Sequence, residues 1–271
     1  MGPRAPGPRP PRRKRFGQHF LHDPAVIARI VAALAPQPGE HLVEIGPGRG
    51  ALTERLLACP GCTLDAIEID RDLAAALGPR FSGCARCTLH ECDALRFDFT
   101  ALARARGGRL RILGNLPYNI STPLMFHLLD HAAVISDLTV MLQREVALRL
   151  AAAPGTRDYG RLTVMLAPQV EVVRLFDVGP GAFQPPPRVW SAVVRLSVRD
   201  RPSFAVSRHF APVVAAAFNQ RRKTLRNALS HLLSREAISA CGIDPGTRPE
   251  RLTPQDFNSL ATALDRAGAC G

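Results

Sequence analysis

Four consecutive residues, Asn115, Leu116, Pro117 and Tyr118, place a carboxamide, a rigid turn and an aromatic ring next to one another. The carboxamide oxygen can accept a hydrogen bond from an exocyclic amine, and proline fixes the backbone so that nearby carbonyl groups point one way. The tyrosine ring can stack on the face of a nucleobase. These residues suit the binding of a planar ring that carries an amine, although an Asn-x-Pro sequence is also common in ordinary turns.

A glycine-rich turn, residues 46–50, follows an apolar strand pattern at 42–45 and precedes a helical pattern. A turn of this kind between a strand and a helix is typical of nucleotide-cofactor sites, because glycine lets the backbone approach the ligand closely. The turn begins with Gly46, and its G-x-G-x-G spacing differs from the G-x-G-x-x-G of dinucleotide enzymes. On its own, the turn also fits a purely structural role.

Polar side chains follow the strands that come next in the sequence. Glu68 stands near the end of the second strand, where a carboxylate can accept hydrogen bonds from both hydroxyls of a ribose. Asp93 follows the third strand and can accept from an adenine amine, and Asn115 follows the fourth. Parallel strands bring their carboxyl ends to one edge of a sheet, where such sheets bind ligands. The set favours S-adenosyl-L-methionine over NAD because the dinucleotide spacing is missing, whereas Glu68 fits either cofactor.

Strand and helix patterns alternate along most of the chain and predict an α/β fold built around a doubly wound, mainly parallel sheet. A helix is expected to begin at Asp23-Pro24, because Pro is favoured at the first helical position. Glu171–Val178 and Val189–Val198 are expected to pair as an antiparallel hairpin at the end of the sheet. The remaining expected elements are strands at 64–70, 88–92, 109–114 and 136–142 and helices at 51–58, 71–77, 121–130, 144–152 and 159–168.

The character of the sequence changes after residue 200. Apolar residues recur at helical spacing from Phe210 onward, and the residues from Thr253 to Asp256 have the pattern of a capping box. These patterns predict a separate helical unit at the end of the chain. The expected parts are a disordered basic tail at 1–15, a cofactor-binding domain at 16–200 and a small all-helical domain at 205–271.

The charge of the chain indicates a polyanionic partner. The formal net charge is +12, and residues 1–15 hold six basic residues and no acidic one. A second basic cluster is formed by Arg221, Arg222, Lys223 and Arg226. We expect nucleic-acid binding, with solvated basic surfaces as the alternative. No apolar run is long enough to cross a membrane and the N-terminus does not resemble a secretory signal, so we expect a cytoplasmic protein.

Two cysteine pairs, Cys59/Cys62 and Cys84/Cys87, have C-x-x-C spacing. Two such pairs resemble the ligand pattern of structural zinc. The residues between the pairs have the pattern of a strand and a helix instead of a short zinc loop, although both pairs are expected at the same end of the sheet. Reduced thiols are the favoured interpretation and no metal is assigned, while zinc binding stays open.

Six short segments have residue types in common with one family: KRFGQHFL at 14–21, EIGPG at 44–48, GNLPYNISTP at 114–123, YGRL at 159–162, FQPPPRV at 183–189 and FNQRRKT at 218–224. Together they resemble the bacterial small-subunit (16S) rRNA adenine N6,N6-dimethyltransferases over about residues 14–265. The resemblance implies a Rossmann-like, S-adenosylmethionine-dependent methyltransferase domain followed by a small all-helical domain that binds rRNA. The combination of segments is specific, whereas the glycine turn alone is not.

The resemblance also implies a reaction. Methyl groups would pass from S-adenosyl-L-methionine to N6 of two adjacent adenosines in a 3'-terminal hairpin of 16S rRNA, giving N6,N6-dimethyladenosine during small-subunit maturation. The partner would be 16S rRNA within a pre-30S particle, and the enzyme would be a monomer. The implied cofactor contacts are His19, Leu21, Gly46, Glu68, Asp93 and Asn115.

We expect the transfer step to depend mainly on positioning. The N6 lone pair of adenine is delocalised into the ring, and hydrogen bonds to the Asn115 side chain and the Leu116 carbonyl would orient the amine and free that lone pair. Tyr118 would stack on the base, and Phe183 is a candidate for its opposite face. The base must leave its stack to enter such a pocket. The residues expected to hold the rRNA backbone are Arg221, Arg222, Lys223 and Arg226.

Two residues depart from the family pattern: His19 stands where Asn is frequent, and Trp190 stands where Asp is usual. A histidine can still form a hydrogen bond, and Trp190 concerns local packing more than chemistry. The alternative functions are a 23S rRNA adenine methyltransferase of the macrolide-resistance group, a non-catalytic nucleic-acid-binding relative or assembly factor, and a nicotinamide oxidoreductase. Residues 119–123 and 218–224 favour the small-subunit branch, and the glycine spacing disfavours the oxidoreductase.

Overall fold

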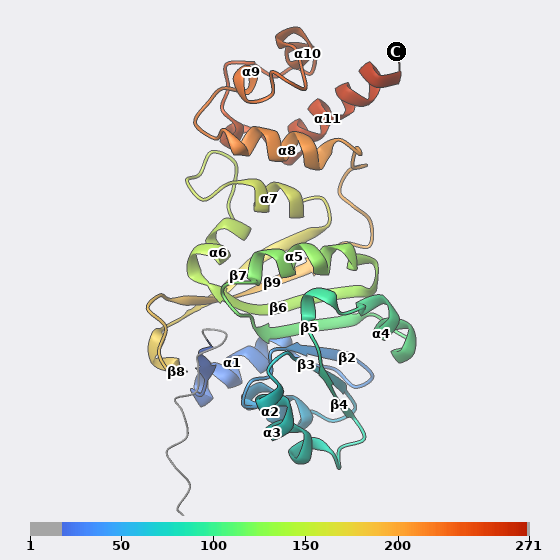
Figure 1. Cartoon of the computed structure of the whole chain (residues 1–271), viewed down its shortest axis with the longest axis vertical. Helices are drawn as coiled ribbons and strands as arrows, with labels where there is room; N and C mark the ends of the chain where they lie inside the picture. Colours follow the sequence, from blue (N-terminus) through green and yellow to red (C-terminus); the bar gives the residue numbers. More distant parts are fainter. Residues whose placement is uncertain (1–17, 270–271) are drawn as a thin grey trace, which may run out of the picture.

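The structure is a computed structural model that describes residues 18–269 of the 271-residue chain. Figure 1 shows a sheet with helices on both faces in the lower part of the molecule and a group of helices stacked at the upper end. The expected basic tail at residues 1–15 lies outside the described residues. None of the described helices is both long enough and apolar enough to cross a membrane.

The central sheet has seven strands in the order β4-β3-β2-β5-β6-β9-β7. Neighbouring strands from β4 to β6 run parallel, and β9 runs antiparallel to both β6 and β7. The predicted α/β class with a mainly parallel, Rossmann-like sheet is therefore confirmed. The strands are β2 (His41–Ile45), β3 (Thr63–Glu68), β4 (Cys87–Glu91), β5 (Leu110–Asn115), β6 (Ile135–Gln143), β7 (Val170–Val178) and β9 (Ser191–Val198).

Helices cover both faces of the sheet, because the strands in its middle are apolar on both sides. Successive residues of a strand face opposite sides. Leu42 and Leu113 therefore pack with α1 and α2, whereas Val43 and Ile112 pack with α4 and α5 on the other face. The helices of this part are α1 (Pro24–Leu34), α2 (Ala51–Leu57), α3 (Arg71–Phe81), α4 (Phe99–Arg106), α5 (Ser121–Asp130), α6 (Arg144–Leu150) and α7 (Arg161–Leu166), with short 3-10 helices η1 (Ala94–Arg96), η2 (Ala132–Val134) and η3 (Pro180–Ala182).

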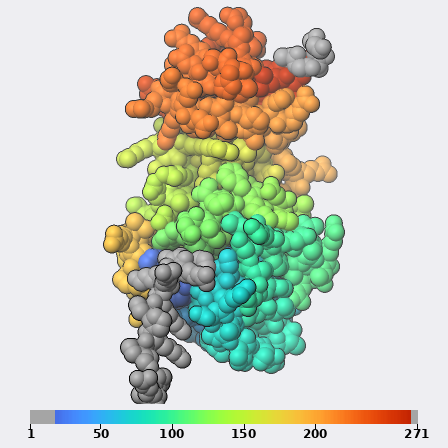
Figure 2. Space-filling view, in the orientation of Figure 1, coloured from blue at the N-terminus to red at the C-terminus, as the bar shows by residue number. Residues whose placement is uncertain are grey.

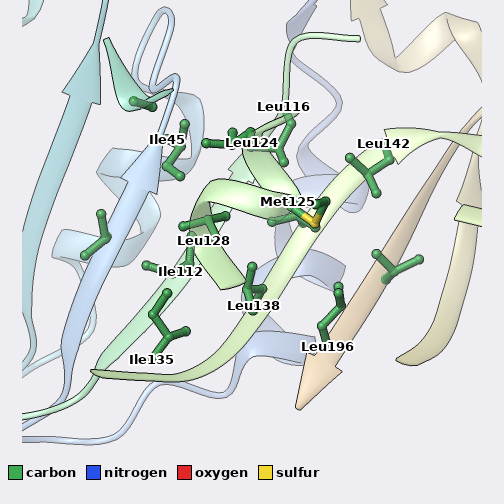
Figure 3. Packing of buried hydrophobic residues seen from close by; sticks show 14 of the residues in the cluster. Ile45, Ile112, Leu116, Leu124, Met125, Leu128, Ile135, Leu138, Leu142 and Leu196 are labelled. Carbon is green, nitrogen blue, oxygen red and sulfur yellow. The ribbon is translucent and has the colours of Figure 1, made fainter. Parts of the chain in front are cut away.

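The helix α5 lies across β5 and β6 and fixes the end of β5 (Figure 3). Leu124, Met125 and Leu128 of this helix belong to the same buried cluster as Ile112 and Leu138 of the two strands. Full burial of one such side chain stabilises a fold by about 1.5–3 kcal/mol. The strand end that leads into the turn after residue 115 is therefore anchored in the core.

Helix caps follow the sequence signals. The Asp23 carboxylate accepts hydrogen bonds from the backbone N–H groups of Ala25 and Val26 at 2.8 and 3.1 Å, so α1 begins where it was predicted to begin. The backbone N–H of Asp256 donates to Thr253 Oγ1, and that of Thr253 donates to the Asp256 carboxylate, at the start of the last helix. The predicted capping box is confirmed.

The predicted antiparallel pairing of the two late strands is confirmed, but the connection is not a simple hairpin. β9 lies between β6 and β7, and the segment between β7 and β9 contains η3 and the strand β8 (Phe183–Gln184). β8 pairs outside the main sheet with β1 (Phe20–Leu21), which opens the described chain. The helix α4 follows an Asp98 N-cap and was missing from the predicted elements.

The C-terminal helices form a third buried cluster, apart from the two on the faces of the sheet. Their bounds are α8 (Phe210–Asn219), α9 (Leu225–Ala228), α10 (Arg235–Ala240), η4 (Pro249–Arg251) and α11 (Pro254–Ala269). Tyr159 and Val164, which come from the segment between β6 and β7, belong to the same core, and Tyr159 donates to the Leu252 carbonyl at 2.7 Å. The helical unit predicted for residues 205–271 therefore also packs around α7, which lies next to α8 in Figure 1.

Candidate active site

A cleft opens at the carboxyl ends of β2, β3, β4 and β5. It is lined by residues 18–21, 44–49, 51–52, 67–69, 92–95 and 115–120, and its empty space, open mouth included, is about 1250 Å³. Parallel sheets bind ligands at this edge. The expected site residues that line the cleft are His19, Leu21, Gly46, Glu68, Asp93, Asn115, Leu116 and Tyr118.

The glycine-rich turn forms one wall of the cleft through a backbone conformation that favours glycine. Gly46 and Gly48 have φ angles of +72° and +59°. A Cβ on Gly48 would lie 3.1 Å from the Phe20 ring, so a side chain would also crowd the opening segment. The Gly46 N–H donates to the Ile67 carbonyl at 2.9 Å, which fixes the turn to β3.

Glu68 is held in place at the end of β3 by two backbone groups. One carboxylate oxygen accepts from the Gly48 N–H at 3.1 Å, and the other accepts from the Asp70 N–H at 3.0 Å. Each oxygen can accept a further hydrogen bond. Burial raises the pKa of Glu68 and outweighs these two hydrogen bonds. The result is a fixed, almost fully buried carboxyl group that suits a pair of ribose hydroxyls.

The two carboxylate oxygens of Asp93 have different roles, one in a structural hydrogen bond and one in the cleft. One oxygen accepts from the Leu95 N–H at 3.0 Å and caps η1, while no described residue donates to the other oxygen. Apolar side chains such as Ile67, Ile69 and Leu95 line the space beside it. An apolar slot with one carboxylate acceptor fits an adenine ring and its amine, so the residues present fit the nucleoside part of S-adenosylmethionine.

Glu44 is a part of the site to which sequence reasoning gave no role. It lies on β2 beneath the glycine turn, is 1% exposed, and accepts a hydrogen bond from Thr53 Oγ1 of α2 at 2.6 Å. Burial raises its pKa to about 7, the Thr53 hydrogen bond opposes the shift, and the nearby Glu68 carboxylate adds to it. The only sequence signal for this behaviour is an acid inside an otherwise apolar strand.

The orientation of the Asn115 amide follows from its partner. The Asn115 Nδ2 group donates to the His19 carbonyl at 2.9 Å. A carbonyl can only accept, so the amide nitrogen must face His19 and the amide oxygen must face away. None of the residues 18–269 donates to that oxygen. Asn115 thus offers an acceptor to the cleft, as an amine-binding role requires.

Leu116 and Tyr118, which follow Asn115 in the turn, are each fixed by a different part of the sheet. The Leu116 N–H donates to the Met141 carbonyl at 3.1 Å, and its side chain is buried beside Leu124 (Figure 3). No hydrogen bond from a described residue reaches the Leu116 carbonyl oxygen. Tyr118 shares a 2.6 Å hydrogen bond with the Ser191 hydroxyl of β9, and burial raises its pKa, which keeps the phenol neutral. The hydroxyl end of the Tyr118 ring is therefore held in place.

The opening segment closes over one side of the cleft. β1 pairs with β8 so that Phe20 faces Gln184 and Leu21 faces Phe183. His19 Nδ1 also lies 2.8 Å from the Pro185 carbonyl, and its ring centroid is 5.8 Å from that of Tyr118. The segment is therefore tied to the β7–β9 connection.

Phe183 lies in a different place from the other candidate residues. Its side chain is 2% exposed and packs in the same buried cluster as Leu21, and it is not among the residues that line the cleft. In this structure it belongs to the buried cluster that contains Leu21, a residue of the cleft wall. A contact between Phe183 and an acceptor base stays a prediction, and it would need the β1–β8 pair to shift.

The basic cluster lies in the helical unit, away from the cleft residues. Arg221, Arg222 and Lys223 follow α8, Arg226 lies in α9, and all four are exposed. Residues 218–223 line a shallow surface hollow. The orange surface in Figure 2 shows this helical unit at the opposite end of the molecule from the blue and cyan part. The structure therefore separates the basic cluster from the cleft.

The paired cysteines lie at the amino ends of β3 and β4, which are neighbouring strands. Cys62 Sγ donates to the Gln37 carbonyl at 3.0 Å, and burial raises the pKa of both Cys62 and Cys87. Within residues 18–269, no group of three or more His, Cys, Asp or Glu side chains is arranged to hold a metal ion. The described thiols are free.

Comparison with known proteins identifies relatives along nearly the whole chain. The family model described as Ribosomal RNA adenine dimethylase matches residues 11–266. The ribosomal RNA small subunit methyltransferase A of Methylococcus capsulatus is 54% identical over 254 residues, covering 93% of this chain and 98% of that protein. The protein of the same name from Nitrosococcus oceani is 55% identical over 251 residues, covering 92% and 94%.

Two solved structures resemble this one over most of its length. A dimethyladenosine transferase from Plasmodium falciparum superposes with a TM-score of 0.79 at 24% identity, covering 92% of this chain and 98% of that chain, which shows a common fold. The 23S rRNA methyltransferase ErmE superposes with a TM-score of 0.67 at 27% identity, covering 91% and 99%.

Proposed function

Because this chain belongs to the ribosomal RNA adenine dimethylase family, we propose that it methylates N6 of two adjacent adenosines in a 3'-terminal hairpin of 16S rRNA. The product is N6,N6-dimethyladenosine, formed during maturation of the small subunit. The observation that carries the proposal is the Asn115 amide, whose nitrogen is engaged by His19 while its oxygen remains an acceptor in the same cleft as Glu68 and Asp93.

The chain is a methyltransferase, and its cofactor is S-adenosyl-L-methionine. When bound, this cofactor supplies a methyl group that is activated by a positively charged sulfur. The carboxylates of Glu68 and Asp93 would hold the ribose hydroxyls and the adenine amine, and the turn at Gly46 would admit the cofactor without a steric clash. His19 and Leu21 would cover it from the opening segment.

The acceptor amine is activated by hydrogen bonds. The Asn115 amide oxygen and the Leu116 carbonyl can each accept from one N6–H, which directs the amine lone pair out of conjugation with the ring. Both acceptors are fixed before the base arrives, since the Leu116 side chain is 1% exposed and the Asn115 nitrogen is tied to His19. Fixed acceptors lose little entropy when they bind substrate, and this positioning lowers the barrier.

Tyr118 supplies the aromatic face for the acceptor base. The Ser191 hydroxyl anchors the phenol at 2.6 Å, so the ring has little freedom to turn away. Stacking holds the adenine parallel to the ring, and the aromatic face also stabilises the positive charge that passes from the sulfur to the amine during transfer. The target base must be flipped out of its helix to reach this ring.

The helical unit would position the RNA. Its exposed basic residues Arg221, Arg222, Lys223 and Arg226 would contact phosphates, and such contacts make binding strongly dependent on salt. We further propose that the enzyme acts in the cytoplasm as a monomer on 16S rRNA within a pre-30S particle. The net charge of +12 supports an RNA-rich partner.

Two other functions are less well supported. A 23S rRNA target is disfavoured because the relatives named for the small subunit are 54–55% identical to this chain, whereas the 23S rRNA methyltransferase is 27% identical. A non-catalytic role is disfavoured because the acceptor residues and the cofactor-facing carboxylates are all present in one cleft.

The proposal is tested by methyl transfer from labelled S-adenosylmethionine to immature 30S and to 50S particles, followed by nucleoside analysis. Dimethyladenosine is expected in the 30S sample alone, and dimethyladenosine in the 50S sample alone would contradict the assignment. Asn115→Ala is expected to abolish transfer to 30S particles with an unchanged circular dichroism spectrum. Near-normal transfer by this variant would remove Asn115 from the mechanism.

A further inference from the structure

The side chain of Trp190 is large, apolar and exposed to solvent. It is the only tryptophan of the chain, and it is 55% exposed. Its ring lies against Gly179, where a Cβ would be 3.6 Å from the nearest ring atom, so one side of the indole has a support. An exposed flat ring with a supported side is a suitable stacking surface.

The position of Trp190 connects it to the acceptor half of the cleft. Ser191, the next residue, holds the Tyr118 hydroxyl at 2.6 Å. The pairing of β6 with β9 places Ser191 opposite Gln143, at the carboxyl end of β6. This is the edge of the sheet where Asn115 ends the neighbouring strand β5. Trp190 is therefore next in sequence to the residue that holds Tyr118, and Tyr118 lines the cleft.

The surroundings of Trp190 are basic. The Arg144 N–H donates to the Trp190 carbonyl at 2.9 Å, and the side chains of Arg144 and Arg174 share the single carboxylate of Asp177 at 3.0 and 2.6 Å. Arg188 is exposed and forms no ion pair with any residue from 18 to 269. Three guanidinium groups and one carboxylate leave a local excess of positive charge.

We propose that Trp190 is a stacking platform for an unpaired base of the substrate RNA that flanks the target adenosine, with Arg188 and Arg144 facing the adjacent phosphates. This inference rests on the proposed function, because it assumes that an adenosine enters at Tyr118. Aromatic rings bind unpaired bases of any sequence, and neighbouring arginines attract the backbone. The positive charge matches RNA, and the connection from Trp190 through Ser191 to Tyr118 places that RNA next to the flipped base.

The single tryptophan gives this surface its own signal, because excitation selective for indole reports Trp190 alone. Titration with a deproteinised hairpin RNA that carries unpaired adenosines is expected to quench this fluorescence in a saturable way. A fully paired duplex at the same phosphate concentration is expected to quench it little. Equal quenching by both RNAs, or no quenching by the hairpin, would contradict the proposal that Trp190 stacks on an unpaired base.

Substitutions separate stacking from support of the pocket. Base–aromatic stacking corresponds to roughly a fivefold to 150-fold change in affinity, and a ring supported on one side should lie near the lower end. Trp190→Ala is expected to raise the KM for RNA about five- to tenfold with kcat and cofactor affinity unchanged. Trp190→Phe is expected to bring the KM most of the way back to that of the unmodified protein. A fall in kcat at unchanged KM would overturn the proposal, because it would mean that Trp190 only supports Ser191. Methyl transfer by the unmodified protein tests the proposed function separately.

Discussion

Replacing Glu44 by glutamine tests whether the site contains a buried acid that is neutral over part of the physiological range. Glu44 lies on β2 with 1% of its surface exposed, and its one side-chain partner is the Thr53 hydroxyl at 2.6 Å. Burial penalises the charged form more than this hydrogen bond favours it, so the pKa of Glu44 rises from its usual 4.5 to about 7. Glutamine has nearly the same shape and never carries the charge.

The magnitude follows from the two pKa values. The folded protein holds a proton on Glu44 that the unfolded chain releases above pH 4.5, so the free energy of unfolding falls as the pH rises from 4.5 to about 7. A pKa unit corresponds to about 1.4 kcal/mol, which gives about 3 kcal/mol for the whole shift. Between pH 5 and pH 8 the loss is about 2.5 kcal/mol. Glu44→Gln should not show this loss.

The assay is urea-induced unfolding at several pH values, followed by circular dichroism in the absence of cofactor. We expect the stability of Glu44→Gln relative to the unmodified protein to increase by about 2.5 kcal/mol from pH 5 to pH 8. Glu54→Gln, on the same α2 helix, is the control. Its side chain is 58% exposed and pairs with Arg80 at the surface, so this variant should differ from the unmodified protein by the same amount at pH 5 and at pH 8. A difference between Glu44→Gln and the unmodified protein that stays constant over this range would refute the reasoning.

Three further substitutions test other parts of the structure. Tyr118→Phe keeps the aromatic ring that we propose stacks on the base but leaves the buried Ser191 hydroxyl without its partner. Thermal unfolding should therefore show a loss of about 1–2 kcal/mol, while methyl transfer stays within about tenfold. Gly48→Ala forces a side chain into a φ of +59° and to 3.1 Å from an aromatic ring, and should cost about 1–2 kcal/mol and weaken cofactor binding in calorimetry. Asp65→Ala removes the buried partner of Arg106 at 2.6 Å and should lower the free energy of unfolding by about 3 kcal/mol in urea; an unchanged value would show that the pair adds nothing.

The strands and the cleft were predictable because local signals and one rule of topology agree. The strands β2, β3 and β5 are short apolar runs that lead into a glycine, an acid or an amide, and parallel strands bring such ends to a common edge. This was enough to place Glu68, Asp93 and Asn115 in one site, and the structure has all three lining one cleft. The start of α1 was also predictable, since Asp23 caps it through a bond within three residues.

Features that depend on contacts between distant segments were not predictable. The β1–β8 pair joins Phe20 to Gln184, and neither segment has a strand pattern long enough to be recognised alone. Tyr159 belongs to a segment between two strands, yet its hydroxyl bonds to Leu252 within the C-terminal helical core. The C-x-x-C spacing left zinc binding open beside the favoured interpretation of reduced thiols, because spacing carries no information on the direction of side chains; Cys62 donates to the Gln37 carbonyl.

The bond between Asn115 and His19 couples the two halves of the cleft. The amide nitrogen of Asn115 holds the opening segment at the His19 carbonyl, and this same bond turns the amide oxygen toward the space in which the acceptor amine would sit. The opening segment is in turn held by its pairing with Phe183 and by the bond from His19 to Pro185. The acceptor geometry therefore depends on closure of residues 18–21. A change that releases residues 18–21 would free the Asn115 amide to rotate. It would then weaken the proposed hydrogen bond to the adenine amine, although every residue proposed to contact the acceptor is unchanged.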